Sequence, residues 1–207
     1  AAPSRAIGGF ARRFRFAVSG SDRDGQPFIW HYFFNKGGTG GNLHHDGWSN
    51  IGGLHNPGGT PSPSVERTEA SYPLVVEEYA LVTDSGGAGT RRGGLGGRLV
   101  LRYEGTADAI VNASGEGVDV VPYGVAEGLD ARGHAYRIET PDGEARTIGV
   151  HDSAIRFSQG GRIVCDSAGG GGFGDPQNRS QEAVARDVRF GYVSPEAAQR
   201  IYRRERQ

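Results

Sequence analysis

Glycine is unusually abundant in this chain and strongly clustered. The sequence holds 36 glycines in 207 residues, whereas glycine makes up about 7% of an average globular protein. The glycines gather at residues 37–41, 86–96 and 169–174, without the strict three-residue period that collagen requires. This distribution excludes a collagen-like chain and predicts many tight turns.

The balance of charge argues against polyanionic partners. Lys and Arg number 23 and Asp and Glu number 24, so the basic surface typical of a protein that binds nucleic acid or anionic membranes is missing. We therefore expect no nucleic acid and no membrane among its partners. The chain is long enough to bury a core and has no clear linker, so we expect residues 1–207 to form a single domain.

Cysteine content and hydropathy indicate the compartment. Cys165 is the only cysteine, so no intrachain disulfide can form, and a reducing environment is indicated. No stretch approaches the roughly 20 apolar residues that cross a bilayer, and together these features predict a cytoplasmic protein. Methionine is absent, even at position 1. Either an initiator was removed from before Ala1 or the chain is a fragment.

Several segments have the composition of β-strands. Two such runs, residues 14–18 and 28–34, flank an Asp-Gly turn and predict a hairpin. The step from Pro141 to Gly143 predicts another turn, since glycine tolerates a positive φ. Further strands are expected near residues 74–82, 99–103, 109–111, 118–121, 135–140, 146–150 and 162–165. Together they predict a sandwich or barrel-like β body.

The end of the chain has the pattern of helices. Ser180 is a typical N-cap for a helix that ends at Gly191, and Ser194 followed by Pro195 starts a second one. These form a helical tail at about residues 180–204. The predicted fold is thus mainly β, with glycine-rich loops and two short carboxy-terminal helices, and α+β overall.

One segment has neither pattern. Residues 37–63 are rich in Gly, Asn, His and Pro, which predicts a long loop, and loops of this length are either functional or disordered. A short helical turn is expected after it, at residues 65–69.

Glycine-bearing blocks follow one another in a fixed order along almost the whole chain. They lie at residues 37–47, 65–74, 84–96 and 169–176, before the closing segments 184–188 and 191–198. This ordered set resembles the hydantoinase B/oxoprolinase family, which includes the related large subunits of acetone and acetophenone carboxylases. The resemblance is to the carboxy-terminal half of such a subunit.

The resemblance implies one subunit of an ATP-dependent heteromeric enzyme that is inactive alone. A hydantoinase A-type partner would bind ATP and magnesium and phosphorylate a small-molecule substrate, and the B-type subunit would take the activated species. A cyclic amide such as hydantoin or 5-oxoproline would then be hydrolysed. The alternatives are a subunit of an ATP-dependent ketone carboxylase, acting on acetone or acetophenone, and a non-catalytic assembly subunit.

The chain also departs from the family pattern. In the family, the His and Asp ligands of a divalent metal lie in an amino-terminal half that has no counterpart here. No cofactor is therefore predicted on this chain, and the missing half is itself an expected partner. Residues 42–45 stand where the family usually has an Ala-Arg-Pro step, and Ser167-Ala168 replaces the usual Thr-Pro.

Three adjacent residues of the glycine-rich segment carry ligand chemistry. His44, His45 and Asp46 have the imidazole and carboxylate groups that zinc, iron and manganese sites use. They are candidates for a metal site, and His45 and Asp46 are also candidates for catalysis. Neither HExxH nor CxxC spacing supports a metal, so hydrogen bonding within the loop is the favoured interpretation.

Two carboxylates are spaced for one face of a helical turn. Glu66 and Glu69 are three residues apart, and such a pair can act in acid/base catalysis if burial separates their pKa values. The favoured alternative is that they form ion pairs with Arg91 or Arg92.

The glycine-flanked arginines are candidates for phosphate binding. Arg91 and Arg92 could hold a phosphorylated intermediate through bidentate hydrogen bonds, although fixing a glycine-rich turn is the favoured role. Residues 169–174 lie between a predicted strand and a predicted helix, as phosphate loops do, but close packing explains their glycines equally well. Cys165, in an apolar run, is expected to be a buried small hydrophobe rather than a nucleophile.

Overall fold

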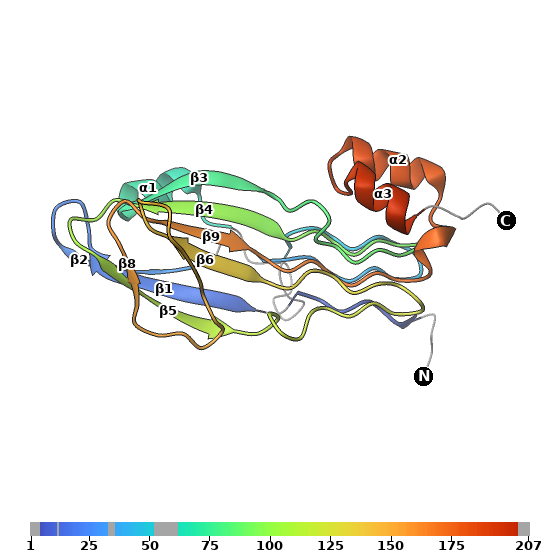
Figure 1. The fold of residues 1–207 in the computed structure, drawn as a ribbon, viewed down its shortest axis with the longest axis horizontal. Coiled ribbons are helices and arrows are strands. Elements are labelled where there is room, and N and C mark those ends of the chain that lie inside the picture. Colours follow the sequence, from blue (N-terminus) through green and yellow to red (C-terminus); the bar gives the residue numbers. More distant parts are fainter. Residues whose placement is uncertain (1–4, 12, 33–35, 52–61, 203–207) are drawn as a thin grey trace.

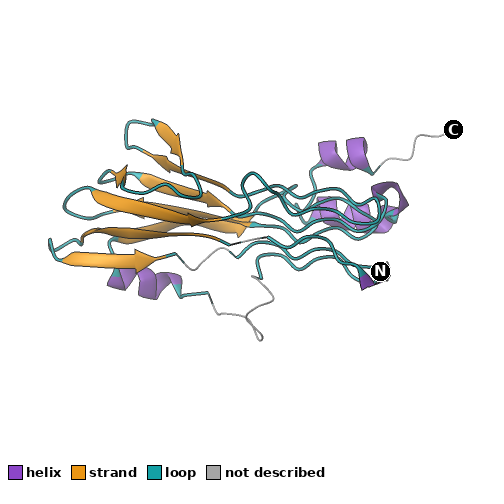
Figure 2. Ribbon diagram, turned by 90° about the horizontal axis from the view of Figure 1, so that it is seen from below, coloured by secondary structure: helices purple, strands orange, loops and turns teal. Residues whose placement is uncertain are grey.

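The molecule is elongated, with its strands at one end and two of its helices near the other. The structure is a computed structural model in which residues 5–11, 13–32, 36–51 and 62–202 are described. Long segments without helix or strand continue from the β body and run side by side toward the far end, where two helices pack on them (Figures 1 and 2). Among the described residues, no helix is long and apolar enough to span a membrane.

The β body consists of two antiparallel sheets. The first has the order β2-β1-β5-β8 and the second β3-β4-β9-β6-β7. Their strands are β1 (Phe14–Ser21), β2 (Pro27–His31), β3 (Leu74–Leu81), β4 (Gly97–Tyr103), β5 (Ala109–Gly115), β6 (Ala135–Glu139), β7 (Ala145–Thr147), β8 (Ile155–Phe157) and β9 (Arg162–Asp166).

The two sheets pack face to face around one hydrophobic core. In β4, buried residues alternate with partly exposed ones from Gly97 to Tyr103, as a strand with one face in the core requires. The core draws side chains from both sheets, among them Phe16 and Val111 from the first and Leu101 and Ile163 from the second. The mainly β, α+β prediction is therefore confirmed, in the form of a sandwich and without a closed barrel.

The predicted hairpin and turn are present. β1 and β2 pair in antiparallel register, with Val18 opposite Trp30. Between β6 and β7, Gly143 has a φ of 94°, the left-handed region in which glycine lacks the steric cost of a side chain.

Glycine-rich segments from five parts of the sequence form what we call the glycine bundle. They are residues 7–11, 36–51, 85–96, 122–133 and 168–174. Residues 168–174 contact several of the others. The amides of residues 169 and 172 donate to segment 122–133, those of residues 170 and 173 to segment 85–96, and that of residue 171 to segment 7–11, at 2.8 to 3.1 Å.

Along residues 169–173, amides three positions apart donate to the same neighbouring segment. A repeat of three residues is that of a polyproline II backbone. Such a backbone makes no internal hydrogen bonds, so its amides are available to neighbouring segments. Glycine allows the segments to approach closely. A Cβ added to Gly170 would lie less than 3.0 Å from the backbone of Thr39, a distance that real side chains do not adopt.

The glycine clusters therefore serve packing more than turning. Only seven described glycines have a positive φ, so a left-handed backbone does not account for most of them. The long loop predicted at residues 37–63 is confirmed over residues 37–51, which form no helix or strand. It is packed rather than open, however, because residues 38–41 are buried in the bundle. Residues 52–61 of that prediction lie outside the described residues.

The helices α1, α2 and α3 and the 3₁₀ helix η2 complete the described fold. α1 (Val65–Ser71) packs beside β3, and η2 (Pro176–Asn178) precedes α2 (Gln181–Arg189) and α3 (Pro195–Ile201). The hydroxyls of Ser180 and Ser194 accept hydrogen bonds from amides in the first turns of α2 and α3, as their sequences predict. We call residues 180–202 the helical hairpin. A small core that includes Val184, Val193 and Tyr202 holds it together.

The structure corrects two strand predictions and adds one strand. Residues 118–121 form no strand, because the chain there enters the glycine bundle, where the carbonyl of Pro122 accepts from the amide of Ala131. The strand predicted at residues 146–150 is limited to β7. β8, with three residues, is too short for its alternation to be recognised in the sequence.

Candidate functional site

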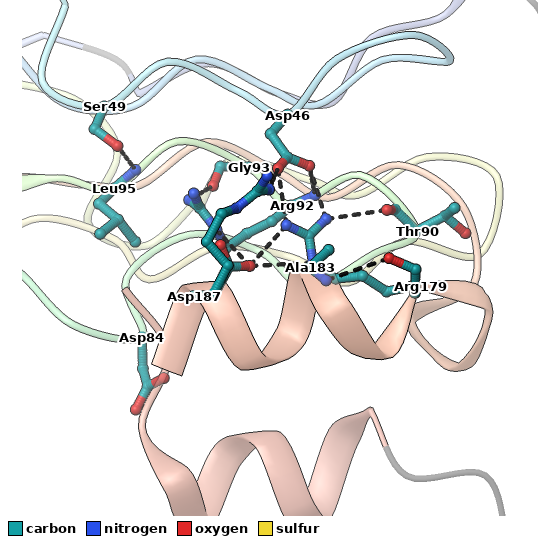
Figure 3. A network of polar contacts seen from close by, with 12 residues as sticks. Asp46, Ser49, Asp84, Thr90, Arg92, Gly93, Leu95, Arg179, Ala183 and Asp187 are labelled. Carbon is teal, nitrogen blue, oxygen red and sulfur yellow. Dashed lines mark hydrogen bonds and ion pairs between the residues drawn. The ribbon is translucent and has the colours of Figure 1, made fainter. Parts of the chain in front are cut away.

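Two aspartates and two arginines form a buried network between the glycine bundle and the helical hairpin (Figure 3). Asp46 and Arg92 belong to the bundle, Arg179 follows η2, and Asp187 lies on α2. The side chains of Arg179 and Asp187 are 1% and 2% exposed, and that of Arg92 is 5% exposed. We call these four residues the acid–arginine network.

Arg179 is the centre of the network. Its Nη1 and Nη2 each donate to one carboxylate oxygen of Asp46 at 2.8 Å. Its Nε and Nη2 donate to Oδ2 of Asp187 at 3.1 and 2.7 Å, and Nη1 also donates to the carbonyl of Thr90 at 3.0 Å. This planar fork of donors is the geometry in which arginine binds carboxylates most strongly.

Arg92 joins the same group from the other side. Its backbone amide donates to Oδ1 of Asp46 at 2.9 Å, and its Nη1 donates to the carbonyl of Gly93. Its Nε lies 3.5 Å from Oδ2 of Asp187, and its guanidinium carbon lies 5.2 Å from the centre of the Tyr192 ring. The guanidinium is thus in contact with protein both along its edge and over its face.

The network is close to electrically neutral, because two carboxylates meet two guanidiniums. Arg186, whose side chain is half exposed, lies 3.7 Å from Asp46 at the rim. Burial raises the pKa of the Asp46 carboxyl, but hydrogen bonding and ion pairing with Arg179 outweigh burial and lower the pKa below its usual value. Burial likewise opposes the charged form of Arg179, yet Asp46 and Asp187 raise its pKa.

These contacts define what the network can do. Each charged group forms an ion pair with another charged group of the network, and three of the four side chains are almost fully buried. The arrangement holds α2 against the bundle and presents no free base or nucleophile to solvent. Its chemistry is that of a structural clamp, which is costly to break because a lone buried charge would remain.

The two histidines that were candidates for a metal site take no part in this network. His44 and His45 are exposed, and their backbone amides donate to the side-chain oxygen of Asn42 at 2.9 and 3.0 Å. Asp46 instead points toward the arginines (Figure 3). In the part of the chain that the structure describes, no three His, Cys, Asp or Glu side chains could hold a metal ion. The described residues therefore do not fit a metal centre.

Glu66 and Glu69 share helix α1 but act separately. The hydroxyl of Ser64 donates to Glu66 at 2.6 Å, and this hydrogen bond lowers the pKa of that carboxyl. Glu69 accepts from the backbone amide of Val76 at 2.8 Å. Each carboxylate thus supports local backbone structure. The predicted ion pairs with Arg91 or Arg92 are wrong, since Arg92 pairs with Asp187 and α1 lies at the opposite end of the molecule (Figure 1).

The candidate phosphate-binding residues point in different directions. Arg91 is exposed, and its backbone exchanges two hydrogen bonds with Phe173. Arg92 is turned inward and contacts carboxylates. The run 169–174 is the centre of the glycine bundle rather than a strand-to-helix phosphate loop. Cys165 is fully buried, as expected, and burial raises the pKa of its thiol well above the usual value.

Sequence reasoning found Asp46 and Arg92 but missed Arg179 and Asp187. Asp187 does leave a signal, because it lies three residues after Val184 on the buried face of α2, where an unpaired carboxylate would be unfavourable. Arg179 gives no comparable signal, since its partner Asp46 is 133 positions away in the sequence.

Comparison with known proteins identifies the family. The family model described as hydantoinase B/oxoprolinase matches residues 1–176. The chain belongs to the hydantoinase B/oxoprolinase family. It is 36% identical over 169 residues to the beta subunit of caprolactamase from Pseudomonas jessenii, covering 80% of this chain and 29% of that protein. It is 28% identical over 166 residues to the B subunit of a putative D-/L-hydantoinase from Pseudomonas sp. strain NS671, covering 79% of this chain and 27% of that protein.

Two solved structures have the same fold. The ATP-dependent caprolactamase from Pseudomonas jessenii matches 98% of this chain and 36% of its own chain, with a TM-score of 0.82 and 31% identity. A nucleotide-free acetone carboxylase matches 92% of this chain and 29% of its own, with a TM-score of 0.81 and 23% identity. This member of the family thus spans less than a third of the length of the two curated relatives.

Proposed function

We propose that this chain is part of a B-type subunit in a heteromeric enzyme that uses ATP to hydrolyse a cyclic amide. The observation that carries the proposal is the match to the beta subunit of caprolactamase, at 36% identity over 80% of the chain. The match to the B subunit of a putative hydantoinase supports the same reaction class, because both names denote the opening of a ring at an amide bond.

The second candidate is an ATP-dependent ketone carboxylase. The likeness to acetone carboxylase favours it in fold. At 23% identity, against 31% for the caprolactamase structure, that likeness ranks below the likeness to an amidohydrolase. In our proposal, the amide hydrolysis and the ketone carboxylation would begin with the same step, in which a partner subunit uses ATP to phosphorylate a carbonyl oxygen of the substrate.

Within this enzyme, we assign the chain a positioning role. Its ionisable network is closed on itself, and the two candidate histidines, His44 and His45, are exposed. ATP and magnesium would bind to an A-type partner, and a divalent metal to another part of the B-type subunit. The β-sandwich and the glycine bundle would hold a rigid wall against the reaction site and help to keep an activated intermediate from bulk water.

The test is reconstitution. The chain is co-expressed with the remainder of a B-type subunit and an A-type subunit, and ATP hydrolysis is measured with caprolactam, hydantoin, 5-oxoproline, acetone and acetophenone, each with and without bicarbonate. We expect ATP-dependent ring opening of a cyclic amide by the complete assembly alone. Bicarbonate-dependent turnover of a ketone would assign the carboxylase instead, and turnover by the isolated chain would reject the positioning role.

Two variants test whether the chain supplies a catalytic group. His45→Ala and Glu66→Ala change exposed residues whose side chains lie outside the acid–arginine network, so kcat is expected to stay within twofold of the unsubstituted enzyme. If either variant assembled normally and lost most of kcat, the chain would take part in the chemistry itself.

A further inference from the structure

A groove separates helix α1 from the edge strand β2. Its volume is about 910 Å³, which is within the range of ligand-binding sites. Both apolar and hydrogen-bonding side chains line it: Ile29, Trp30, His31, Ser62, Pro63, Ser64, Arg67, Thr68, Ser71 and Tyr72. The acid–arginine network lies at the other end of the molecule, so this groove is a separate feature.

One face of α1 forms a wall of the groove. Ser64, Arg67, Thr68 and Ser71 follow the spacing of three and four residues that places side chains on one side of a helix. The guanidinium of Arg67 is exposed, and no carboxylate among the described residues forms an ion pair with it. The two glutamates of α1 are engaged elsewhere, by Ser64 and by the amide of Val76.

The opposite wall is the outer edge of a sheet. Among the described residues, β2 is the terminal strand of its sheet and pairs with β1 alone. The amide of Tyr32 donates to the carbonyl of Phe16, and hydrogen-bonded pairs alternate along an antiparallel ladder. The amide and carbonyl of Ile29 therefore point away from β1. The Ile29 side chain is 70% exposed, an unusual state for a large apolar residue on an open edge.

We propose that this groove binds an extended peptide segment that adds a strand to the outer edge of β2 and places an acidic side chain against Arg67. An edge strand facing a helix is a known arrangement for strand addition, in which main-chain hydrogen bonds give affinity and the helix side chains select the sequence. The apolar residues of the segment cover Ile29, and its carboxylate complements the guanidinium.

The segment is assigned to the part of a B-type subunit that lies outside the region matched here. The matched region is 29% of the beta subunit of caprolactamase, so such a subunit has ample further chain to supply one strand. Covering the edge in this way also removes a site for unwanted strand pairing. The binding site is the same whether the enzyme hydrolyses amides or carboxylates ketones.

The experiment uses the full 207-residue chain. Fluorescent 12-residue peptides that tile the unmatched part of the beta subunit of caprolactamase from Pseudomonas jessenii are screened by anisotropy, and hydrogen exchange locates the contact. We expect binding by a peptide with an acidic residue between apolar ones, together with slower exchange in β2.

Paired variants separate the contributions. Arg67→Glu should weaken binding at least tenfold, and the matched charge reversal Arg15→Glu, on the same sheet outside the groove, should change it less than twofold. Ile29→Pro removes the outward amide without removing a bond to β1, whereas Ile29→Thr keeps that amide. Binding should therefore fall about tenfold for proline and clearly less for threonine.

Each outcome supports or overturns the proposal. If no peptide binds, or if Arg67→Glu leaves binding unchanged, the proposal is overturned. If β2 becomes protected with rising concentration of the chain alone, the occupant is a second copy and the assignment to a B-type segment is wrong. Should Ile29→Pro fail to fold by circular dichroism, the comparison of Arg67→Glu with Arg15→Glu still decides whether the groove binds an acidic segment.

Discussion

Replacing Arg179 by methionine should release the helical hairpin while leaving the β-sandwich folded. The substitution keeps a long side chain but removes five hydrogen bonds to Asp46, Asp187 and Thr90. Removing one partner of a buried ion pair typically costs about 3–5 kcal/mol, because the other charge remains buried without compensation. Here two carboxylates lose their main partner.

The apolar contacts of the helical hairpin cannot absorb a loss of that size. They come mainly from Val184, Val193, Ala197 and Tyr202. Burial of a large apolar side chain contributes about 1.5–3 kcal/mol, and much of that sum is offset by the entropy of ordering the segment. The sandwich has its own larger core, to which the helical hairpin contributes no residue.

Hydrogen exchange measured by mass spectrometry tests this directly. Since about 1.4 kcal/mol corresponds to a factor of ten, we expect amides of α2 and α3 to exchange roughly 10² to 10³ times faster, and those of β4 and β9 to stay unchanged. Arg156→Met is the matched control, because its ion pair with Asp108 is exposed on both sides and should contribute little to stability.

Two results would refute the reasoning. Exchange in α2 and α3 that changed by less than threefold would mean that the network does not hold the helical hairpin. Equal acceleration in β9 would mean that the helical hairpin and the sandwich unfold as one unit.

Three further outcomes are expected. Gly170→Ala places a Cβ less than 3.0 Å from neighbouring backbone. In urea titrations it should therefore lower the free energy of unfolding by about 1–3 kcal/mol or more. Gly143→Asn, at an open position that asparagine tolerates, should lower it less. Arg179 lowers the pKa of Asp46 below its usual 3.8, so its stabilisation is present above pH 3.8 and is lost as pH falls through the lower folded pKa; Asp46→Asn should flatten that acid dependence of α2 exchange. Cys165 is buried with a raised thiol pKa, so Ellman's reagent should label it only after denaturation; rapid labelling of the native chain would contradict its packing.

Features encoded by neighbouring residues could be predicted from the sequence. The alternation in β4, the hairpin of β1 and β2, and the serine caps of α2 and α3 depend on side chains a few positions apart. Local sterics and hydrogen bonding are enough to specify them. The order of the glycine blocks was also enough to suggest the family, which the family model confirms.

The glycine bundle and the acid–arginine network required the tertiary structure. A glycine-rich segment has no side chains to select its neighbours, so its sequence alone does not reveal that residues 169–174 contact four other segments. Asp46 lies beside two histidines in the sequence and was a candidate metal ligand. In the structure it instead pairs with Arg179, which is 133 positions away in the sequence. A carboxylate forms an ion pair with a cation that folding places close to it. Only the packing of distant segments decides which cation that is.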